Sequence, residues 1–258
     1  MKNYGLLAAV AVGFVISVGG RDFVAWSEPS DLGCRRDVSA LTEMHSSLPF
    51  PPYLSEDNPV KRGGEFDPNT YFQVLPHLKI REGFALDYVY HHDGMGGYPI
   101  LYARPVGQAP YVDEAAYRAA GDRPDYLEFV IPQDNAEGYF EFALLAMMAN
   151  QFYRDWHANY NDWKPVCGFE GIEEVIQSLE SGNPPARPMS DQQKAEARAI
   201  QNPSPTVALN GTTATVTTVV FTKWGGSYRR TLVINRGDHS IADEQDVPLV
   251  DYDCGIAF

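Results

Sequence analysis

Residues 206–235 read TVALNGTTATVTTVVFTKWGGSYRRTLVIN, and this stretch decides the fold class. Asn210-Gly211 is a strong two-residue hairpin turn near its start. Thr212–Thr222 is rich in threonine and valine, which favour strands. Trp224-Gly225-Gly226 then turns the chain into Ser227–Asn235, which returns as a further strand. The stretch therefore predicts a β-meander, in which consecutive strands pair in antiparallel fashion.

A second hairpin is expected nearer the N-terminus. Phe84–Tyr90 has the composition of a strand, Asp93–Gly97 is a glycine-rich turn, and Tyr98–Ala103 returns as the partner strand. A further strand is expected over Tyr126–Ile131, where Pro132 ends it.

Three helices are expected between the two groups of strands. Asp134, three residues before Glu137, resembles a capping box that opens the longest helix. Apolar residues continue at helical spacing to Tyr160, so this helix is expected to be largely buried and to end before Pro165. The two shorter helices are expected at Gly168–Glu180 and Ser190–Gln201. Together these elements predict an α+β fold, with an antiparallel sheet packed on one long and two short helices.

The first residues predict contact with a membrane. Residues 4–20 carry no charge, and Lys2 precedes them, as in a signal peptide or membrane anchor. As a helix, this run spans about 25 Å, which suits a cleaved signal, whereas a helix continued to Trp26 spans about 34 Å and could be retained as an anchor. Retention is favoured by a stripe of small residues that could pack against another membrane helix. The stripe consists of Gly5, Ala9, Gly13 and Ser17.

The expected domain organisation has three parts. Residues 1–26 form a transmembrane anchor or signal peptide, and residues 27–69 form an extended tether rich in proline and glycine. Within the tether, only Val38–His45 is expected to be helical. Residues 70–258 form the extracytoplasmic α+β domain, and its last part, Asp238–Phe258, is expected to be an acidic tail.

Charge limits the partners. The chain has 258 residues and a formal net charge of −14, which repels nucleic acid. The same charge favours basic proteins or divalent cations, although it can also serve solubility alone.

The chain has three cysteines, Cys34, Cys167 and Cys254, and their spacing fits no CxxC metal or redox site. An odd number allows at most one bridge within the chain. We expect a bridge between Cys167 and Cys254, with three separate thiols as the alternative.

Two histidine clusters are candidates for chemistry. His91 and His92 precede Asp93 at a strand end, where one histidine and the aspartate could bind a metal, although a polar strand end is the favoured explanation. His157, with Asp162 nearby, could act as a base or ligand, although histidine is also natural at a helix C-terminus.

A third candidate is the acidic end of the chain. Asp251 and Asp253 could supply oxygen ligands to Ca²⁺, together with acidic residues at 243, 244 and 246. Their spacing is not that of an EF-hand, and a solvated acidic tail is the alternative.

These patterns predict a membrane-anchored, extracytoplasmic structural or accessory subunit of a larger membrane assembly. Its partners would be membrane protein subunits that contact the N-terminal helix, and a basic soluble protein that contacts the acidic domain. The alternative is a secreted or periplasmic hydrolase or ligand-binding protein that uses His157, and His91 or His92, with a divalent metal. The sequence holds no GxGxxG, P-loop, HExxH or GxSxG motif, so no cofactor is assigned and an enzyme is the less favoured reading.

Overall fold

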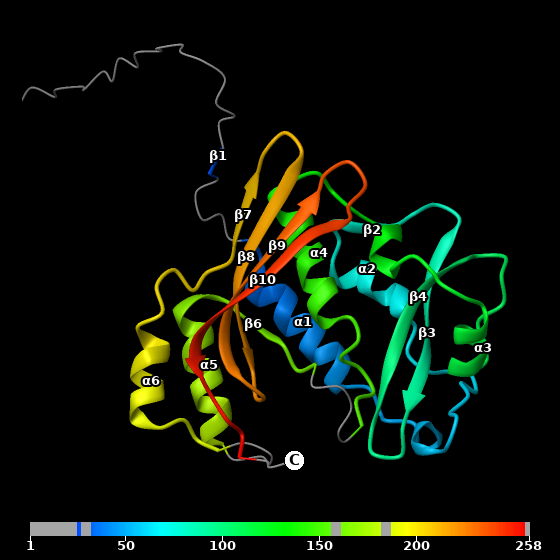
Figure 1. Ribbon diagram of the computed structural model, residues 1–258, viewed down its shortest axis with the longest axis horizontal. Coiled ribbons are helices and arrows are strands. Elements are labelled where there is room, and N and C mark those ends of the chain that lie inside the picture. The colour runs from blue at the N-terminus through cyan, green and yellow to red at the C-terminus, as the bar shows by residue number, and fades with distance from the viewer. Residues whose placement is uncertain (1–24, 27–31, 156–160, 182–186, 256–258) are drawn as a thin grey trace, which may run out of the picture.

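A six-stranded antiparallel sheet forms one layer of the molecule (Figure 1). The computed structural model describes residues 25–26, 32–155, 161–181 and 187–255. The strands of this sheet are, in spatial order, β1 (Ala25–Trp26), β7 (Thr206–Leu209), β8 (Thr213–Thr222), β9 (Gly226–Asn235) and β10 (Ile241–Asp251), with β6 (Lys164–Val166) beside β8. The meander predicted for residues 206–235 is thus confirmed as the centre of the sheet.

Side chains and glycines fix the two turns of the meander. Between β7 and β8, the Asn210 side-chain oxygen accepts hydrogen bonds from the backbone N–H groups of Thr212 and Thr213, at 2.8 and 2.7 Å. Between β8 and β9, Gly226 has a φ of +99°, and a Cβ there would collide with the carbonyl oxygen of Val250. This turn therefore requires glycine.

The expected acidic tail is wrong for its first half, because residues 241–251 form β10 and pair with β9 along its length. Seven consecutive residues of β10, from Ala242 to Pro248, are exposed. An edge strand exposed on both faces lacks the apolar alternation by which strands are recognised, and charges such as Asp243 suit an exposed edge.

The helix α4 (Ala136–Met148) packs against the sheet and forms the centre of the main hydrophobic core. It is shorter than expected, since it ends at Met148 rather than near Tyr160. Phe152 is fully buried although it lies beyond the helix, so aromatic spacing alone could not locate the helix end. The N-cap is Asn135, whose side chain accepts from the N–H of Gly138, while Asp134 pairs with Arg236 instead.

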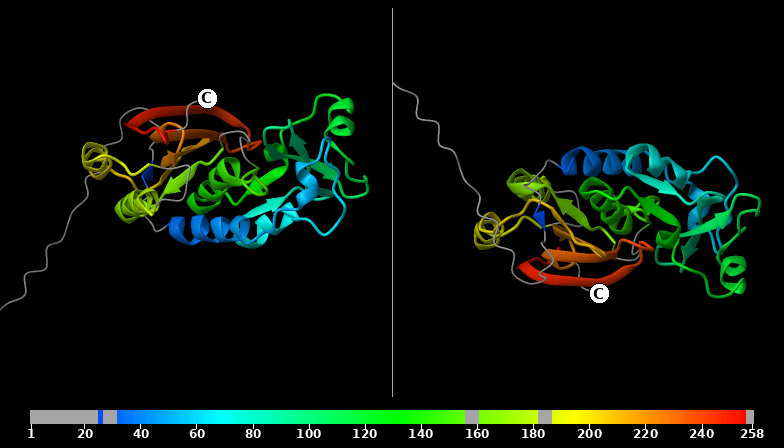
Figure 2. Two further views of the ribbon diagram at one scale, coloured as in Figure 1. Left: turned by 90° about the horizontal axis from the view of Figure 1, so that it is seen from below. Right: turned by 90° about the horizontal axis from the view of Figure 1, so that it is seen from above.

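Figure 2 shows α4 between the sheet and a further helix, α1 (Cys34–Ser46). Leu41 of α1 and Leu54, in the segment that follows, are fully buried in the main core. From residue 32 onward, the segment expected to be an extended tether is therefore part of the folded domain. Its other short elements are η1 (Pro52–Ser55), η2 (Pro68–Thr70) and α2 (Tyr71–Val74).

Two helices cover the opposite face of the sheet at one end: α5 (Gly168–Glu180) and α6 (Asp191–Arg198). Both were expected from the sequence, and α5 has the predicted bounds. Ser190 and Gln193 form a reciprocal capping box that starts α6. A second hydrophobic cluster lies between these helices and the sheet.

The one disulfide among the described residues joins Cys34, at the start of α1, to Cys167, the residue before α5. Cys254 is a free, buried thiol. The expected Cys167–Cys254 bridge is therefore wrong. Residue spacing carries no information on which cysteines the packed layers bring together.

The expected N-terminal hairpin is confirmed as β3 (Phe84–His92) and β4 (Gly97–Pro105), at the end of the molecule opposite α5 and α6 (Figure 1). The strand expected over Tyr126–Ile131 is mostly a 3-10 turn. The neighbouring elements are α3 (Glu114–Ala119), η3 (Tyr126–Phe129), and a small antiparallel pair of β2 (Leu78–Ile80) and β5 (Val130–Pro132).

The expected membrane anchor falls mainly outside the described residues, and with it the stripe of Gly5, Ala9, Gly13 and Ser17. Its expected last residues differ from a helix, because Ala25 and Trp26 form β1 and pair with β7. Pairing there occupies hydrogen-bonding groups at the edge of β7. Within the part of the chain that the structure describes, no helix is long and apolar enough to cross a membrane.

Candidate functional site

His91, His92 and Asp93 each contact different partners. The His91 ring lies 2.6 Å from a carboxylate oxygen of Glu114 in α3, whereas His92 lies 3.7 Å from Asp155. The carboxylate of Asp93 accepts hydrogen bonds from backbone N–H groups in the turn that follows it. Neighbouring strand residues face opposite sides, so the two histidines do not meet at one site.

The other expected site residues are also separate. His157 lies outside the described residues. Asp162 accepts hydrogen bonds from the Thr222 hydroxyl and the Lys223 N–H, so it holds the end of β8. Asp253 accepts from a backbone N–H two residues on, and Asp251 ends β10. Over the described ranges, no three His, Cys, Asp or Glu side chains come together as a metal site.

A cavity of about 370 Å³ beside β4 is the strongest candidate site. This volume lies within the range of small-molecule pockets, about 300–1,000 Å³. Its walls come from four separate parts of the chain: β4, α3, the segment that enters η3, and Asn150, which follows the C-cap of α4. The polar groups among them are Tyr98, Tyr117, Arg123, Asp125, Tyr126 and Asn150.

Arg123 supplies the cavity with a positive charge that no described residue neutralises. Its guanidinium carbon lies 4.2 Å from the ring centroid of Tyr111 and 5.2 Å from that of Tyr117. Such stacking holds the guanidinium plane but leaves its in-plane N–H groups free. The Nε atom is buried and has no hydrogen-bond partner among the described residues. A buried donor without a partner costs about 1–3 kcal/mol, so a ligand that accepts from this side chain would be favoured.

The tyrosines that hold Arg123 are themselves fixed to the hairpin. Tyr102, on β4, lies 5.1 Å from the ring centroids of both Tyr111 and Tyr117. The hydroxyl of Tyr102 accepts the backbone N–H of Tyr111 at 2.9 Å, and the Gln108 side chain donates to the hydroxyl of Tyr111. The loop between β4 and η3 is therefore held against the outer face of the hairpin.

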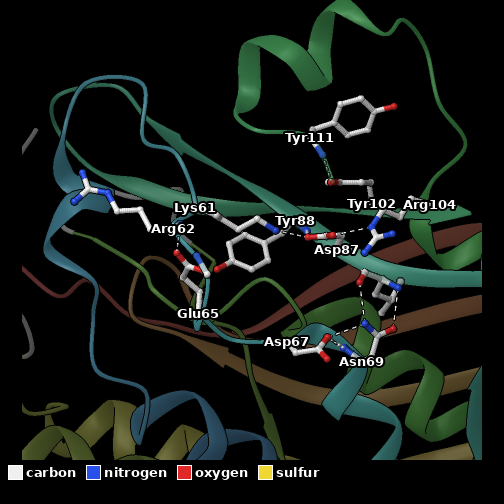
Figure 3. A network of polar contacts seen from close by, with 12 residues as sticks. Lys61, Arg62, Glu65, Asp67, Asn69, Asp87, Tyr88, Tyr102, Arg104 and Tyr111 are labelled. Carbon is white, nitrogen blue, oxygen red and sulfur yellow. Dashed lines mark hydrogen bonds and ion pairs between the residues drawn. The ribbon is translucent and has the colours of Figure 1, made fainter. Parts of the chain in front are cut away.

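An ionic network extends this support (Figure 3). Lys61 and Arg104 both donate to the buried carboxylate of Asp87, and Arg104 also donates to the carbonyl of Gln108 at 2.6 Å. Burial alone would raise the pKa of Asp87, but these hydrogen bonds outweigh it and hold the pKa below the usual 3.8. Asp87 is thus ionised at neutral pH, and the contacts from it lead through Gln108 and Tyr111 to Arg123.

Asp125 gives the same cavity a negative charge. One of its carboxylate oxygens accepts the N–H of Leu127 at 2.8 Å, which makes Asp125 the N-cap of η3. Although Arg123 and Asp125 are two residues apart and line one cavity, they form no ion pair with each other. Pro124, between them, restricts the backbone, and each side chain is held by other contacts.

Other buried ionisable groups have structural partners. Glu141 is fully buried in α4 and accepts from both the backbone and the ring of His77. Burial is the largest influence on the pKa of Glu141 and raises it, against the opposing effect of His77. Burial also lowers the pKa of His45 to about 4, and this ring hydrogen-bonds to Tyr71. These contacts join elements of the core.

Sequence reasoning did not identify Arg123. It lies in Gly121-Asp122-Arg123-Pro124-Asp125, whose composition indicates only a turn. Tyr111 and Tyr117 were the residues that could have indicated a site. Their rings contact Arg123 only after the loop has folded onto β4. Comparisons with protein-family models, with curated proteins and with solved structures gave no match to this chain.

Proposed function

We propose that this chain is an extracytoplasmic, non-enzymatic accessory subunit of a membrane assembly, and that its domain binds a small charged ligand through Arg123. The observation that carries the binding role is the guanidinium of Arg123, which is fixed by two aromatic rings and lacks a polar partner among the described residues. Arginine held in this way suits recognition of a carboxylate or phosphate.

The disulfide supports an extracytoplasmic location of the domain. Bridges such as Cys34–Cys167 form and persist in oxidising surroundings, and they are rare in the reducing cytosol. The uncharged run at residues 4–20 supports export by an independent route. Anchoring through the small-residue stripe, and contact with a basic soluble protein, remain parts of the proposal that rest on the sequence.

The proposed binding role is tested by a thermal-shift screen of the purified full chain against acetate, benzoate and inorganic phosphate. At least one of these anions is expected to raise the melting temperature of the wild-type protein, because binding to the native state stabilises it. Arg123→Gln is expected to abolish that rise. Arg118→Gln is the matched control, since Arg118 is exposed on α3 and pairs with Glu114 away from the cavity lining. A rise that survives Arg123→Gln, or no response of the full chain to any small charged ligand, contradicts the binding role.

Anchoring is tested by intact-mass measurement of the protein from its native membrane. We expect residues 1–20 to be retained and the protein to co-purify with other subunits in mild detergent. A mature N-terminus near Gly20, or elution as a free monomer, would contradict the anchored-subunit proposal. Gly13→Leu places a bulky side chain at the centre of the stripe and is expected to disrupt the assembly.

The alternative, a hydrolase or ligand-binding protein built on His157 and a metal, is not carried further. His91 and His92 contact different carboxylates, and Asp162 holds the end of β8. No described contact favours that alternative.

A further inference from the structure

The cavity beside β4 holds two opposite charges that do not neutralise each other. Arg123 is held by tyrosine rings, and Asp125 is turned toward the N–H of Leu127. An anion alone would satisfy Arg123 but would also meet the carboxylate of Asp125. A ligand that carries both a carboxylate and an ammonium group satisfies both residues.

We propose that the ligand of this cavity is a small zwitterion of the α-amino acid class, an assignment that rests on the proposed binding role of Arg123. The carboxylate of the ligand accepts in-plane N–H groups of Arg123, which is the geometry that guanidinium and carboxylate share. The ammonium group of the ligand lies toward Asp125, whose second carboxylate oxygen is not used by the η3 cap.

The walls indicate what kind of side chain the ligand carries. Tyr98, Tyr117 and Tyr126 provide aromatic surface, and Ile100 and Leu101 provide aliphatic surface. A cavity of about 370 Å³ is large enough for one amino acid with an aromatic or branched side chain. The same walls carry the polar groups of the three tyrosines and of Asn150, so the cavity combines apolar surface with hydrogen-bonding groups.

The charge of the whole protein favours a zwitterion over a simple anion. A formal net charge of −14 repels anions as they approach, and this repulsion slows their association. A zwitterion has no net charge and is not repelled at long range. Selectivity then depends on the short-range contacts with Arg123 and Asp125.

The experiment is isothermal titration of the full chain with a matched set of ligands. The set consists of L-phenylalanine, its N-acetyl derivative, which lacks the ammonium group, and its carboxamide, which lacks the carboxylate. We expect L-phenylalanine to bind, and each blocked derivative to bind about tenfold more weakly or worse. A thermal-shift panel of the other α-amino acids ranks the side-chain preference.

Two variants assign the contacts. Arg123→Gln is expected to abolish binding of L-phenylalanine, and Arg118→Gln to leave it unchanged. Asp125→Asn keeps an oxygen that can cap η3, so the fold is retained. This variant is expected to bind L-phenylalanine and its N-acetyl derivative with equal affinity.

The outcomes separate this inference from the proposed function. If the N-acetyl derivative binds wild-type protein as well as L-phenylalanine does, and Arg123→Gln abolishes both, the zwitterion inference is wrong while the binding role stands. If no α-amino acid binds at millimolar concentration, the inference is also wrong, and the small-anion screen decides the binding role separately.

Discussion

Asp87 is the residue on which the outer face of the β3–β4 hairpin depends. It is 7% exposed, and it accepts hydrogen bonds from two cations that belong to different segments, Lys61 and Arg104. A buried carboxylate is stable only when it is paired in this way. Lys61 also lies 4.3 Å above the ring of Tyr88, so the same ammonium group contacts two consecutive side chains of β3.

Asp87→Asn is expected to lower the free energy of unfolding at pH 7 by about 3 kcal/mol, because it leaves two cations beside a neutral amide. Folding lowers the pKa of Asp87, so the ionised group stabilises the native state above the unfolded-state value of 3.8. That contribution is lost as the pH falls through the lowered folded value. The difference between wild type and variant should therefore shrink below about pH 4 in urea titrations.

The matched control for this substitution is Asp57→Asn, at an exposed position. Its free energy of unfolding should lie within about 0.5 kcal/mol of the wild-type value at every pH. Equal effects of the two substitutions at pH 7 would show that the ionic network does not support the hairpin.

At the scale of elements, the turn between β8 and β9 determines how three strands meet. Gly226 begins β9 and pairs with both Thr222 of β8 and Asp251 of β10. Its positive φ and the nearby carbonyl of Val250 leave no room for a side chain. The register of β10, which sequence analysis missed, therefore depends on a glycine that the sequence indicated only as part of a turn.

Gly226→Ala is expected to lower the free energy of unfolding by about 2 kcal/mol or more, through backbone strain and collision with β10. Gly211→Ala is the control, since a Cβ at Gly211 meets no atom within 4 Å. Chemical denaturation of both variants provides the measurement. A Gly226 variant as stable as the Gly211 variant would mean that β10 moves away at little cost.

The elements that local sequence predicted well are those with both a periodic face and a clear end. In α5, an apolar face repeats from Ile172 to Leu179, and a glycine is the first residue of the helix. In α4, almost every residue is buried, so no polar residues mark the limits of an apolar face. The aromatic residues beyond Met148 continue the helical spacing, and the sequence therefore predicted a longer helix. Tertiary contacts, rather than local propensity, set that boundary.

At the scale of the whole molecule, the disulfide joins two distant parts of the chain at the main hydrophobic core. Cys34, at the start of α1, belongs to this core, and Cys167, the residue before α5, packs against it. The bridge closes a sequence separation of 133 residues. In the chain-entropy view, so long a loop restricts the unfolded chain strongly.

Reduction of the bridge is expected to lower the free energy of unfolding by about 4 kcal/mol. Reductant should destabilise wild-type protein and Cys254→Ser to the same extent, because Cys254 is not bridged. Reductant should have no effect on Cys34→Ser. A Cys254→Ser variant that is insensitive to reductant would contradict the Cys34–Cys167 pairing.

Local sequence could identify the classes of the elements but not the candidate site. The site needs β4, the loop that holds Arg123, and Asn150 at the end of α4 to meet, and these lie up to about 50 residues apart. Sites were predicted at the histidine and acidic clusters because their members are adjacent in the chain. Adjacent residues in a strand point to opposite faces of the sheet. The folded loop instead places Arg123 and Asp125 at one cavity.

The long separation between the bridged cysteines also determines how soon after the synthesis of Cys34 the bridge can form. After Cys34 is synthesised, its partner follows 133 residues later, which takes about 7–27 s at about 5–20 residues per second. The third thiol, Cys254, emerges almost at the end of the chain. Cys34 and Cys167 are therefore both present in the growing chain before their competitor, Cys254, is synthesised.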